Sequence, residues 1–323
     1  MNKEVIISSR IRFARNIKDY PFYSKLDETS AKEIIAKIGE ALGDEYTETD
    51  FGNLEKTTAL SYLEQHKVSS EFVESRLPHA LFEKGDLKIM ACEEDHIRLQ
   101  CIKEGFCLGE TYKEAKEVER LLDSKLNIAF SDEFGYLTHC PTNLGTAMRV
   151  SLMVFLPGIT KTGKYGSVAS SLDKLGVTIR GIYGEGSEAS GSVYQISNTM
   201  TLGTDEESVI KKIEEIAKQI VQTELLQREK IKNADENAFF DRVMRSLGTL
   251  KYARILSSSE FTGHYEILRM ALSFEKLQNI SYEKLDKLFT DVMPANICVG
   301  ANKNLNERER DIKRADIVRS ALN

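Results

Sequence analysis

The chain has 323 residues, of which 41% are hydrophobic, and a formal net charge of −6 at pH 7. This length is enough for one large domain or two ordinary ones. No apolar run approaches the roughly 18 residues that cross a bilayer, and the N-terminus carries no secretory pattern. The acidic balance argues against a general nucleic-acid binder, which needs a basic surface. Five cysteines without CxxC spacing favour neither a disulfide framework nor a zinc site, so we expect a cytoplasmic protein with free thiols.

The first two thirds of the chain predict a sheet with flanking helices. Apolar residues at helical spacing predict helices over 29–43 and 111–126. Alternating or short apolar runs predict strands, and in the longest of them alternation would place Glu94, His96 and Arg98 on one face. We therefore predict an antiparallel β-sheet flanked by helices, an α+β fold. The predicted strands cover residues 4–13, 87–102, 148–156, 177–183 and 192–202.

The chain becomes helical after residue 204. Acidic residues at 205–207 precede an amphipathic pattern that predicts a long helix to about Lys232. We therefore divide the chain into an α+β domain over residues 1–232 and an α-helical C-terminal domain over residues 233–323. Within the second domain, helical periodicity is found at 236–247, 263–274, 282–293 and 307–322.

Two glycine-rich segments imitate nucleotide-binding motifs. Gly158 to Tyr165 nearly matches GxxxxGK[ST], but Tyr165 replaces the hydroxyl that would hold Mg²⁺, and we expect a loop there. Gly184 to Ala189 imitates the dinucleotide fingerprint after a strand, but the chain continues into another strand where a helix is required. We therefore reject both segments as phosphate-binding loops.

Arginines recur on the predicted strands. Arg10 and Arg12 lie two residues apart and so share a face, a pattern that alone would also fit a solvated edge strand. Several arginines on adjacent strands would repel one another unless a polyanion lay among them, and guanidinium forks match phosphate oxygens. A triphosphate meets that requirement. The arginines of this set are Arg10, Arg12, Arg98, Arg149 and Arg180.

Two carboxylates and a thiol form the second part of the pattern. Glu94 lies in the charged segment 93–98, which a structural ion-pair network would explain about as well, and Glu185 lies in a glycine-rich loop. Cys140 is followed by Thr142, whose hydroxyl is placed to donate to a thiolate and lower its pKa, although a lone cysteine is usually inert. Together Glu94, Glu185 and Cys140 would make an anionic slot. Such a slot suits a guanidinium, because a carboxylate can orient this group and accept its proton.

These segments resemble the motifs of the ATP:guanido phosphotransferase family, which includes creatine and arginine kinases. The family patterns S-[ST]-R-[VI]-R, N-E-E-D-H-x-R, C-P-[ST]-N-L-G-T-x-x-R and R-G-x-x-G-E-x-[ST]-E-A correspond in order to residues 8–12, 92–98, 140–149 and 180–189. The resemblance extends over about residues 5–232 and implies a catalytic domain of the glutamine synthetase/guanidino kinase type. One residue departs from the patterns, because Cys92 replaces the usual Asn.

The resemblance implies ATP as the phosphoryl donor, with Mg²⁺ bound to its phosphates and no direct protein ligand for the metal. It also implies that Glu94 is the catalytic carboxylate and that Cys140 contacts the guanidinium. Glu185 matches the second glutamate of arginine kinases, which favours arginine as acceptor. His66 resembles the adenine-side histidine of the family, although a histidine on a surface helix is commoner. The implied nucleotide-binding residues are Ser8, Ser9, Arg10, Ile11, Arg12, His66, Arg98, Arg149, Val150, Ser151, Leu152, Met153, Arg180, Gly181, Ile182, Tyr183, Gly184 and Glu185.

Two further features resemble a bacterial branch of this family that phosphorylates arginine side chains in proteins. The chain begins almost directly at Ser8, without the helical domain that helps the small kinases hold a free amino acid, so we expect an open acceptor pocket. The chain also ends in a helical domain with an R-D-x-x-R-A motif, which in that branch recognises phosphoarginine. This motif is formed by Arg310, Asp311, Arg314 and Ala315.

We therefore predict a kinase that transfers the γ-phosphoryl group of ATP to arginine residues of proteins, marking them for Clp-type proteolysis and regulating stress-response repressors. The resemblance implies protein substrates with exposed arginine, a McsA-like activator, the ClpC/ClpP protease, a CtsR-like repressor and a homodimer, with no direct nucleic-acid or membrane partner. The alternatives are a kinase for free arginine and a catalytically idle phosphoarginine-binding adaptor. The intact charged residues disfavour the adaptor, because an idle site has no need of such costly charges.

Overall fold

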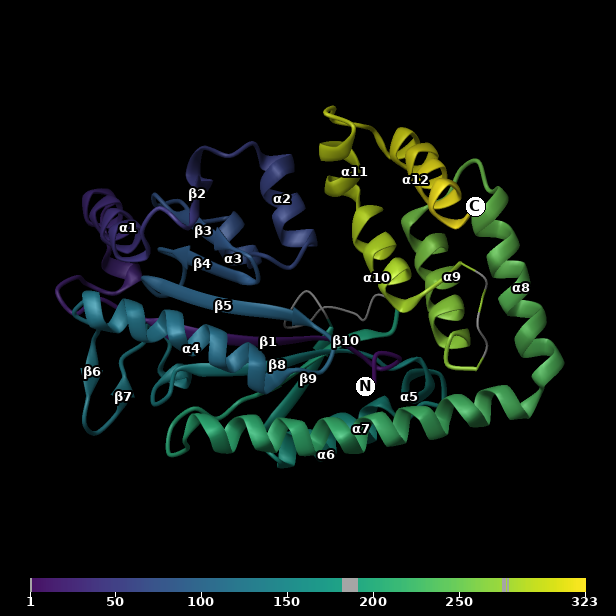
Figure 1. Cartoon of the computed structure of the whole chain (residues 1–323), viewed down its shortest axis with the longest axis horizontal. Coiled ribbons are helices and arrows are strands. Elements are labelled where there is room, and N and C mark those ends of the chain that lie inside the picture. The colour runs from purple at the N-terminus through teal and green to yellow at the C-terminus, as the bar shows by residue number, and fades with distance from the viewer. Residues whose placement is uncertain (1, 182–190, 275–276, 278) are drawn as a thin grey trace.

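The computed structural model describes residues 2–181, 191–274, 277 and 279–323. Its centre is an eight-stranded antiparallel sheet (Figure 1). A separate ribbon pairs β6 (Phe130–Ser131) with β7 (Gly135–Tyr136). The predicted α+β fold class is confirmed. In spatial order, the strands of the large sheet are β2 (Thr47–Asp50), β3 (Ala80–Lys84), β4 (Leu87–Ala91), β5 (Ile97–Glu104), β1 (Ile6–Arg15), β8 (Met148–Phe155), β10 (Val193–Asn198) and β9 (Val177–Gly181).

Helices lie on both sides of the sheet, with α4, α6 and α7 on one side and α2, α3 and the C-terminal helices on the other (Figure 1). Within the described ranges, no helix is both long and apolar enough to cross a membrane. The helices are α1 (Glu28–Leu42), α2 (Lys56–Glu64), α3 (Ser70–Val73), α4 (Leu108–Lys125), α5 (Pro157–Lys161), α6 (Tyr165–Lys174), α7 (Glu206–Ala234), α8 (Glu236–Tyr252), α9 (Ser258–Ala271), α10 (Tyr282–Asp291), α11 (Pro294–Gly300) and α12 (Glu307–Leu322).

Alternation along the central strands gives the sheet one apolar and one polar face. Phe13 on β1 and Leu152 on β8 are fully buried and belong to a core that α1, α4 and α7 complete. On α7, Ile213 and Ile220 of the predicted apolar stripe are buried in the same core. Burial of these side chains removes apolar surface from water, the main favourable term in folding. On the opposite face, the middle of β1 and β8 carries polar side chains, among them Arg12, Arg149 and Ser151.

The predicted helices are all present, although several begin or end about one turn away from the predicted position. Side-chain caps explain where some of them start. Asp205 accepts a hydrogen bond from the Ser208 N–H (2.8 Å) at the start of α7, and Asp27 caps α1 in the same way. Asn306 and Glu309 form a reciprocal capping box at the start of α12. The short elements β2, β3 and α11 are absent from the prediction, because they are too short for a clear periodicity.

The segment predicted as one strand over 87–102 is a hairpin instead. β4 and β5 are joined by a turn in which Cys92 adopts the left-handed conformation (φ 62°). The Cys92 N–H donates to the His96 carbonyl (3.0 Å) and closes the turn. The prediction that His96 shares a face with Glu94 is therefore wrong, since His96 is fully buried. The alternating pattern predicted a strand through this turn because the turn residues continue the spacing of polar residues that a strand would have.

The segment predicted as a loop around Gly158 is helical. Tyr165 opens α6, and its ring stacks on that of Tyr194 with 4.9 Å between centroids. The N–H groups of Gly158 and Ile159 at the start of α5 both donate to the buried Glu224 carboxylate (2.8 Å each). A Cβ on Gly158 would lie 2.9 Å from backbone atoms of α7, so this contact requires glycine. Because Glu224 occupies these donors, the segment is not a phosphate-binding loop.

Two buried arginines fasten the N-terminal residues between the sheet and the C-terminal helices. Arg228 of α7 donates to the carbonyls of Glu4 and Phe155 (3.0 Å each). Its Nε donates to Glu224 (2.6 Å). Arg269 of α9 also donates to the Glu4 carbonyl (2.8 Å). Both side chains are fully buried, so each guanidinium depends on these partners for the hydrogen bonds that water would otherwise supply.

We expect Arg228→Ala to lower the free energy of unfolding by about 3–5 kcal/mol, because it leaves the buried Glu224 carboxylate without its cation. Arg245→Ala is the matched control, since Arg245 pairs with Asp241 on the surface, where its side chain is 77% exposed. An exposed pair contributes little. Urea unfolding of the three proteins would measure the difference. Similar losses in the two variants would contradict the structural role given to Arg228.

Candidate active site

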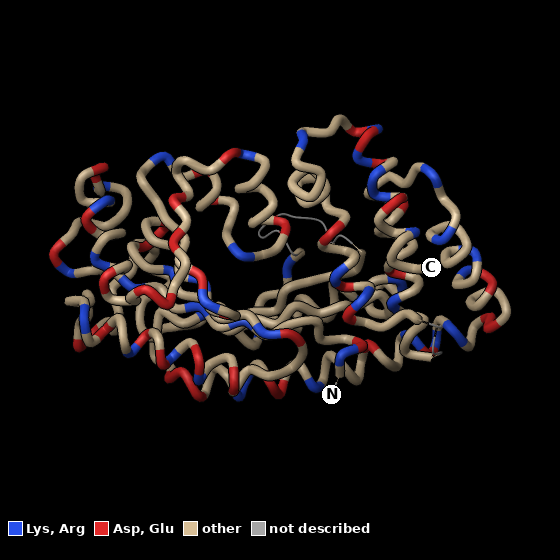
Figure 2. Tube along the Cα trace, turned by 45° about the horizontal axis from the view of Figure 1, so that its top comes forward, with Lys and Arg blue, Asp and Glu red and all other residues tan. Residues whose placement is uncertain are grey.

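The five predicted arginines share the polar face of the sheet. Arg12 on β1 lies directly opposite Arg149 on β8, and Arg10 precedes Arg12 by two residues on the same face. Arg98 on β5 pairs with the β1 residue two positions after Arg12. Arg180 on β9 joins this face through the register of β9, β10 and β8. In Figure 2, blue segments accordingly lie on the strands in the middle of the molecule. We call this set the arginine cluster.

Burial and mutual repulsion make the arginine cluster a site for an anion. Burial, together with the charges of Arg98 and Arg149, lowers the pKa of Arg10 to about 10. Burial and the neighbouring guanidinium groups also lower the pKa of Arg12 well below its ordinary value. A depressed pKa of a cation means that its charged form is disfavoured where it stands. A polyanion on this face would offset that cost.

Glu93 neutralises one member of the arginine cluster. It forms an ion pair with Arg98 and accepts a hydrogen bond from the Ser69 hydroxyl (2.6 Å). Burial raises the pKa of Glu93, but the charge of Arg98 and the hydrogen bonds outweigh it and bring the pKa down to about 2. Arg10 is held in turn by a hydrogen bond to the side-chain oxygen of Gln195. Neither Glu93 nor Gln195 was predicted as a site residue, although Glu93 lies within the recognised motif.

Glu94 and Cys140 lie at one end of the arginine cluster. Glu94 occupies the turn before β5, and its Oε2 lies 3.9 Å from the Arg98 guanidinium. Burial raises the pKa of Glu94, as do the nearby carboxylates, against the opposing charge of Arg98. A carboxylate with a raised pKa is a better proton acceptor near neutral pH. The Cys140 Sγ lies 3.0 Å from the Thr142 hydroxyl, as the sequence indicated.

A hydrogen-bond network joins the turn that carries Glu94 to the segment that carries Cys140. The Asp95 carboxylate accepts from the His139 N–H (2.7 Å) and from the amide of Asn16 (2.6 Å). The same Asn16 accepts from the backbone N–H at the end of the turn (2.9 Å). Both side chains are buried, where a satisfied network fixes one geometry. Asn16 follows β1 directly and has no motif signal, so only the structure could reveal this role.

Cys92, which replaces the usual Asn of the motif, does not face the acceptor slot. Its side chain is fully buried and its Sγ lies 3.7 Å from the Ala31 carbonyl of α1. Burial raises the pKa of this thiol to about 12, so the thiol is neutral. Asn is among the residues that best tolerate the left-handed conformation found here, which accounts for its use at this position. The substitution therefore leaves the charges of the slot unchanged.

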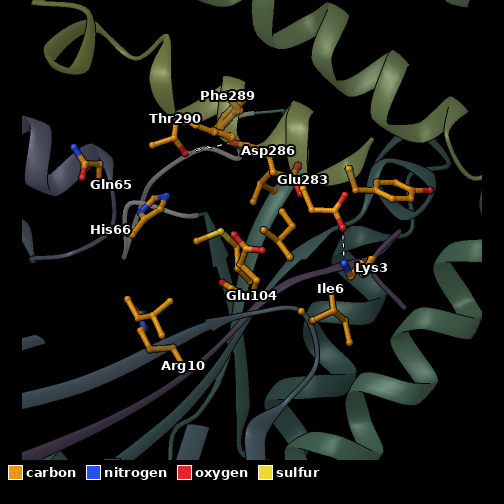
Figure 3. A pocket seen from close by; sticks show the side chains of 18 of the residues that line it. Lys3, Ile6, Arg10, Gln65, His66, Glu104, Glu283, Asp286, Phe289 and Thr290 are labelled. Carbon is orange, nitrogen blue, oxygen red and sulfur yellow. Dashed lines mark hydrogen bonds and ion pairs between the residues drawn. The ribbon is translucent and has the colours of Figure 1, made fainter. Parts of the chain in front are cut away.

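A cavity of about 520 Å³ continues from Arg10 along the same face of the sheet (Figure 3). Ser8, Ser151 and Met153 line its floor. Among the described residues, the buried Ser151 hydroxyl has no hydrogen-bond partner. A buried polar group without a partner is costly, and a ligand in the cavity would supply one. The volume is in the range of small-molecule sites.

His66 borders this cavity from the loop after α2. It has a left-handed backbone (φ 57°) and is not part of a surface helix. Burial and the charge of Arg10 lower the pKa of His66 to about 4. The imidazole is therefore neutral at pH 7 and adds no further positive charge beside the arginine cluster.

The structure does not bring every predicted nucleotide-binding side chain to the polar face. Those of Ser9, Ile11, Val150 and Leu152 lie on the opposite face and are buried. The Ser9 hydroxyl donates to the Gly105 carbonyl (2.8 Å). Gly181 ends β9 beside the arginine cluster without a side chain to contribute. Four predicted residues lie outside the described part of the chain, namely Ile182, Tyr183, Gly184 and Glu185.

The R-D-x-x-R-A motif lies on α12, away from the arginine cluster (Figure 1). Arg314 is buried and donates to the carbonyls of Val292 (3.1 Å) and Leu256 (2.9 Å). Ala315 is buried as well. Arg310 and Asp311 are only half-buried. Because hydrogen bonds to backbone carbonyls already hold Arg314, the half-buried Arg310 is the more accessible guanidinium group of the motif.

Within the described ranges, no group of three or more His, Cys, Asp and Glu side chains could hold a metal ion. Beside the arginine cluster, the Glu93 carboxylate is engaged by Arg98. Hard cations such as Mg²⁺ take oxygen ligands and often use substrate phosphates. The carboxylates found here thus suit a metal that is carried by the substrate better than one held in a protein cage.

Comparison with known proteins covers both parts of the chain. Residues 28–227 match the C-terminal catalytic domain of the ATP:guanido phosphotransferases, and residues 236–323 match the protein-arginine kinase McsB C-terminal domain. A protein-arginine kinase of Caldanaerobacter subterraneus is 37% identical over 331 residues, which cover 100% of this chain and 98% of the relative. Another from Clostridium novyi is 39% identical over 329 residues, which cover 99% and 96%.

Solved structures resemble the fold at lower identity. A duplicated taurocyamine kinase of Schistosoma mansoni, with bound transition state analog components, has a TM-score of 0.63 and 21% identity over 80% of this chain and 38% of its own. Lombricine kinase has a TM-score of 0.60 and 22% identity over 70% of this chain and 67% of its own. These structures support the fold of the sheet and its helices.

We expect inorganic tripolyphosphate to raise the melting temperature of the protein, and Arg12→Met to reduce that rise. A ligand at 100 times its Kd stabilises the folded state by about 2.7 kcal/mol. Without ligand, the variant should be no less stable than the parent, because a repelled cation has been removed. Arg120→Met, on the exposed side of α4, is the control. If Arg12→Met kept the full tripolyphosphate shift, the cluster would not be the anion site.

Proposed function

Because the chain belongs to the ATP:guanido phosphotransferase family, we propose that it is a protein-arginine kinase, which transfers the γ-phosphoryl group of ATP to arginine side chains of proteins. The observation that carries this proposal is the polar face of the sheet, where the arginine cluster ends at Glu94 and Cys140. Similarity to protein-arginine kinases over the whole chain supports the choice of acceptor.

In this proposal, the arginine cluster holds the triphosphate of ATP. Phosphoryl transfer depends mainly on positioning and on stabilising the charge of the transferred group. Arg12 and Arg149 are paired neighbours on β1 and β8 and project from the same face, so both can contact one phosphate, and Arg10 extends the contact along β1. Mg²⁺, when bound to the phosphates, supplies further charge neutralisation. We propose no direct protein ligand for it.

The acceptor guanidinium lies between Glu94 and Cys140. Glu94 orients it and accepts one proton as a guanidinium nitrogen attacks the γ-phosphorus. The new N–P bond forms while the bond to the β,γ-bridging oxygen breaks, and ADP leaves with the electron pair of that bond. The Cys140 sulfur steers the cationic substrate, and Thr142 lies within hydrogen-bond distance of it. Glu185, outside the described residues, is proposed as the second orienting carboxylate.

We propose a boundary near residue 233 between a catalytic domain and a C-terminal domain that binds phosphoarginine and forms a homodimer. Residues 236–323 match the McsB C-terminal domain, which supports this division. The half-buried Arg310 and Asp311 supply the accessible part of the phosphoarginine site. Arg314 and Ala315 form its buried base.

The substrates of this activity are proteins with accessible arginine side chains. We propose, from family resemblance, a cytoplasmic location, a McsA-like activator, delivery of marked proteins to ClpC/ClpP, and control of a CtsR-like stress repressor. No contact with nucleic acid or membrane is needed for these roles. The acidic net charge of −6 agrees with a protein that does not bind nucleic acid directly.

Two alternatives are disfavoured. A kinase for free arginine would share the chemistry, but the C-terminal domain resembles that of protein-arginine kinases. An idle adaptor would not need the depressed pKa values of Arg10 and Arg12 or the raised pKa of Glu94. Groups with perturbed pKa values are concentrated at functional sites.

We expect the purified protein with ATP and Mg²⁺ to form acid-labile phosphoarginine on an arginine-rich protein such as casein, but not on free arginine. Mass spectrometry would map the label. Glu94→Gln should lower the rate by about 10²–10⁴-fold, the usual contribution of a general base, while ATP binding stays intact. Label on free arginine alone would make the protein a metabolic kinase. An equal rate in Glu94→Gln would remove the role given to this carboxylate.

The pH dependence provides a control for the same assignment. Glu94 accepts a proton only when ionised, so kcat/KM should fall as the pH drops through its pKa, which lies above the ordinary 4.5. The residual activity of Glu94→Gln should lack this acidic limb. A limb that persists in the variant would belong to another group.

We expect Arg310→Ala to weaken binding of a phosphoarginine peptide by about tenfold or more, because a hydrogen bond to a charged group contributes roughly 1.5–3 kcal/mol. ATP binding should remain unchanged. Arg310 is preferable to Arg314 for this test, since removal of the buried Arg314 would leave two carbonyls without donors. Calorimetry with both ligands would check the prediction. Equal loss of both ligands would indicate misfolding.

A further inference from the structure

The C-terminal helices border the cavity beside Arg10 on its outer side. Its floor comes from β1, β8 and β10, whereas the facing wall comes from α10, with Asp286, Phe289 and Thr290 (Figure 3). Tyr265 of α9 contributes as well. Residues more than 280 positions apart in the sequence thus line one cavity.

The direction of β1 relates this cavity to the reacting groups. Glu94 lies by Arg98, which pairs with Ala14 near the end of β1. Ser8, at the other end of the strand, lines the cavity. From Arg12 to Ser8, four residues of strand span about 13 Å. If the proposed function holds, a triphosphate with its γ-phosphoryl group toward Glu94 extends along β1, and its nucleoside enters the cavity.

The floor and the facing wall of the cavity suit a nucleoside. Met153 offers a polarisable thioether for a flat base. The buried Ser151 hydroxyl, without a partner among the residues described, can bond to a polar ligand atom. On the facing wall, the Thr290 hydroxyl makes one long hydrogen bond within the described part of the chain, to the Asp286 carbonyl (3.4 Å). This wall is therefore partly polar and partly apolar, as small-molecule sites usually are.

The facing wall is firmly held. The Asp286 carboxylate accepts from the Tyr265 hydroxyl (2.8 Å) and from the guanidinium of Arg269 (2.9 Å). Arg269 is itself bonded to the backbone of the N-terminal residues before β1. The ring centroids of Phe289 and Tyr265 lie 4.5 Å apart. α10 thus keeps a fixed position above the floor of the cavity, which a wall that discriminates between ligands requires.

We propose that α10 of the C-terminal helical part forms the outer wall of the nucleoside pocket, and that Thr290 is a specificity-determining residue for the nucleoside of ATP. This inference rests on the proposed function and deepens it. Its consequence is that the C-terminal part contributes to the affinity for ATP but not to that for a bare triphosphate, which needs only the arginine cluster.

Thr290→Trp tests the proposal, because the larger side chain would fill the space of the nucleoside. We expect its Kd for ATP to rise by about tenfold or more, with KM for ATP rising alike, and its Kd for inorganic tripolyphosphate to stay within about twofold of the parent. Lys284→Trp is the matched control, since Lys284 lies on α10 but does not line the cavity. Calorimetry would give both constants. Unchanged ATP binding in Thr290→Trp would overturn the proposal, as would an equal loss of both ligands in a folded protein.

A second measurement needs no substitution. Irradiation of the wild-type protein with 8-azido-ATP, followed by peptide mapping, should label α10, and excess ATP should suppress the label more strongly than excess tripolyphosphate. Label confined to other segments would overturn the proposal. Failure of the proposed function looks different, because the wild-type protein would then fail to bind ATP or to form phosphoarginine at all. If the wild-type protein binds ATP and forms phosphoarginine normally, and Thr290→Trp binds ATP equally well, the role proposed for α10 is rejected while the proposed function stands.

Discussion

Five guanidinium groups on one face of an antiparallel sheet are the constraint on which the rest of the structure depends. Like charges at the spacing of neighbouring strands repel one another, and burial makes each charge more costly. The largest apolar core lies on the opposite face of the sheet, against α1, α4 and α7. The arginine face has smaller apolar contacts, where Leu81 and Met90 pack with α2 and α3, and where Phe155 and Val193 pack with the C-terminal helices. Beside Arg10, a cavity leaves space for a ligand between the sheet and α10.

The same constraint explains why two adjacent glutamates differ so strongly. A proton acceptor beside several arginines would normally have a depressed pKa and would be a poor base. Here Glu93 forms the close ion pair with Arg98, and its pKa falls to about 2. Glu94 stands 3.9 Å from the same guanidinium, and burial raises its pKa. One glutamate thus neutralises the nearest cation, and the other is left with the proton affinity that base catalysis needs.

The sequence predicted the sheet, the long helices and the arginine cluster because each depends on local periodicity or on a recognised motif. The prediction from sequence failed where tertiary contacts determine the local structure. The turn at Cys92 was hidden within an alternating pattern, and α5 begins where the side chain of Glu224, distant in the sequence, caps its N–H groups. Asn16 carries no motif, yet it joins the turn of Glu94 to the segment of Cys140. The burial of Arg314 depends on carbonyls that only the packing of α12 brings near.

The separate hydrophobic clusters of the chain do not divide its polar face. The largest cluster lies under the sheet, a second joins α8 to α12 to Phe155 and Val193 of the sheet, and a third packs α2 and α3 on β3 and β4. Glu64 at the end of α2, two residues before His66, accepts from the N–H groups of Ala295 and Asn296 at the start of α11 (2.9 and 2.8 Å). Arg269 bonds both to Asp286 on α10 and to the residues before β1. The loop of His66 and the start of β1 are thus each tied to the C-terminal helices. A half-buried carboxylate and a fully buried guanidinium make these ties, so relative motion of the two parts would expose or unpair them at a cost. The polar face is therefore built jointly by the sheet and the C-terminal helices and depends on the packing of both.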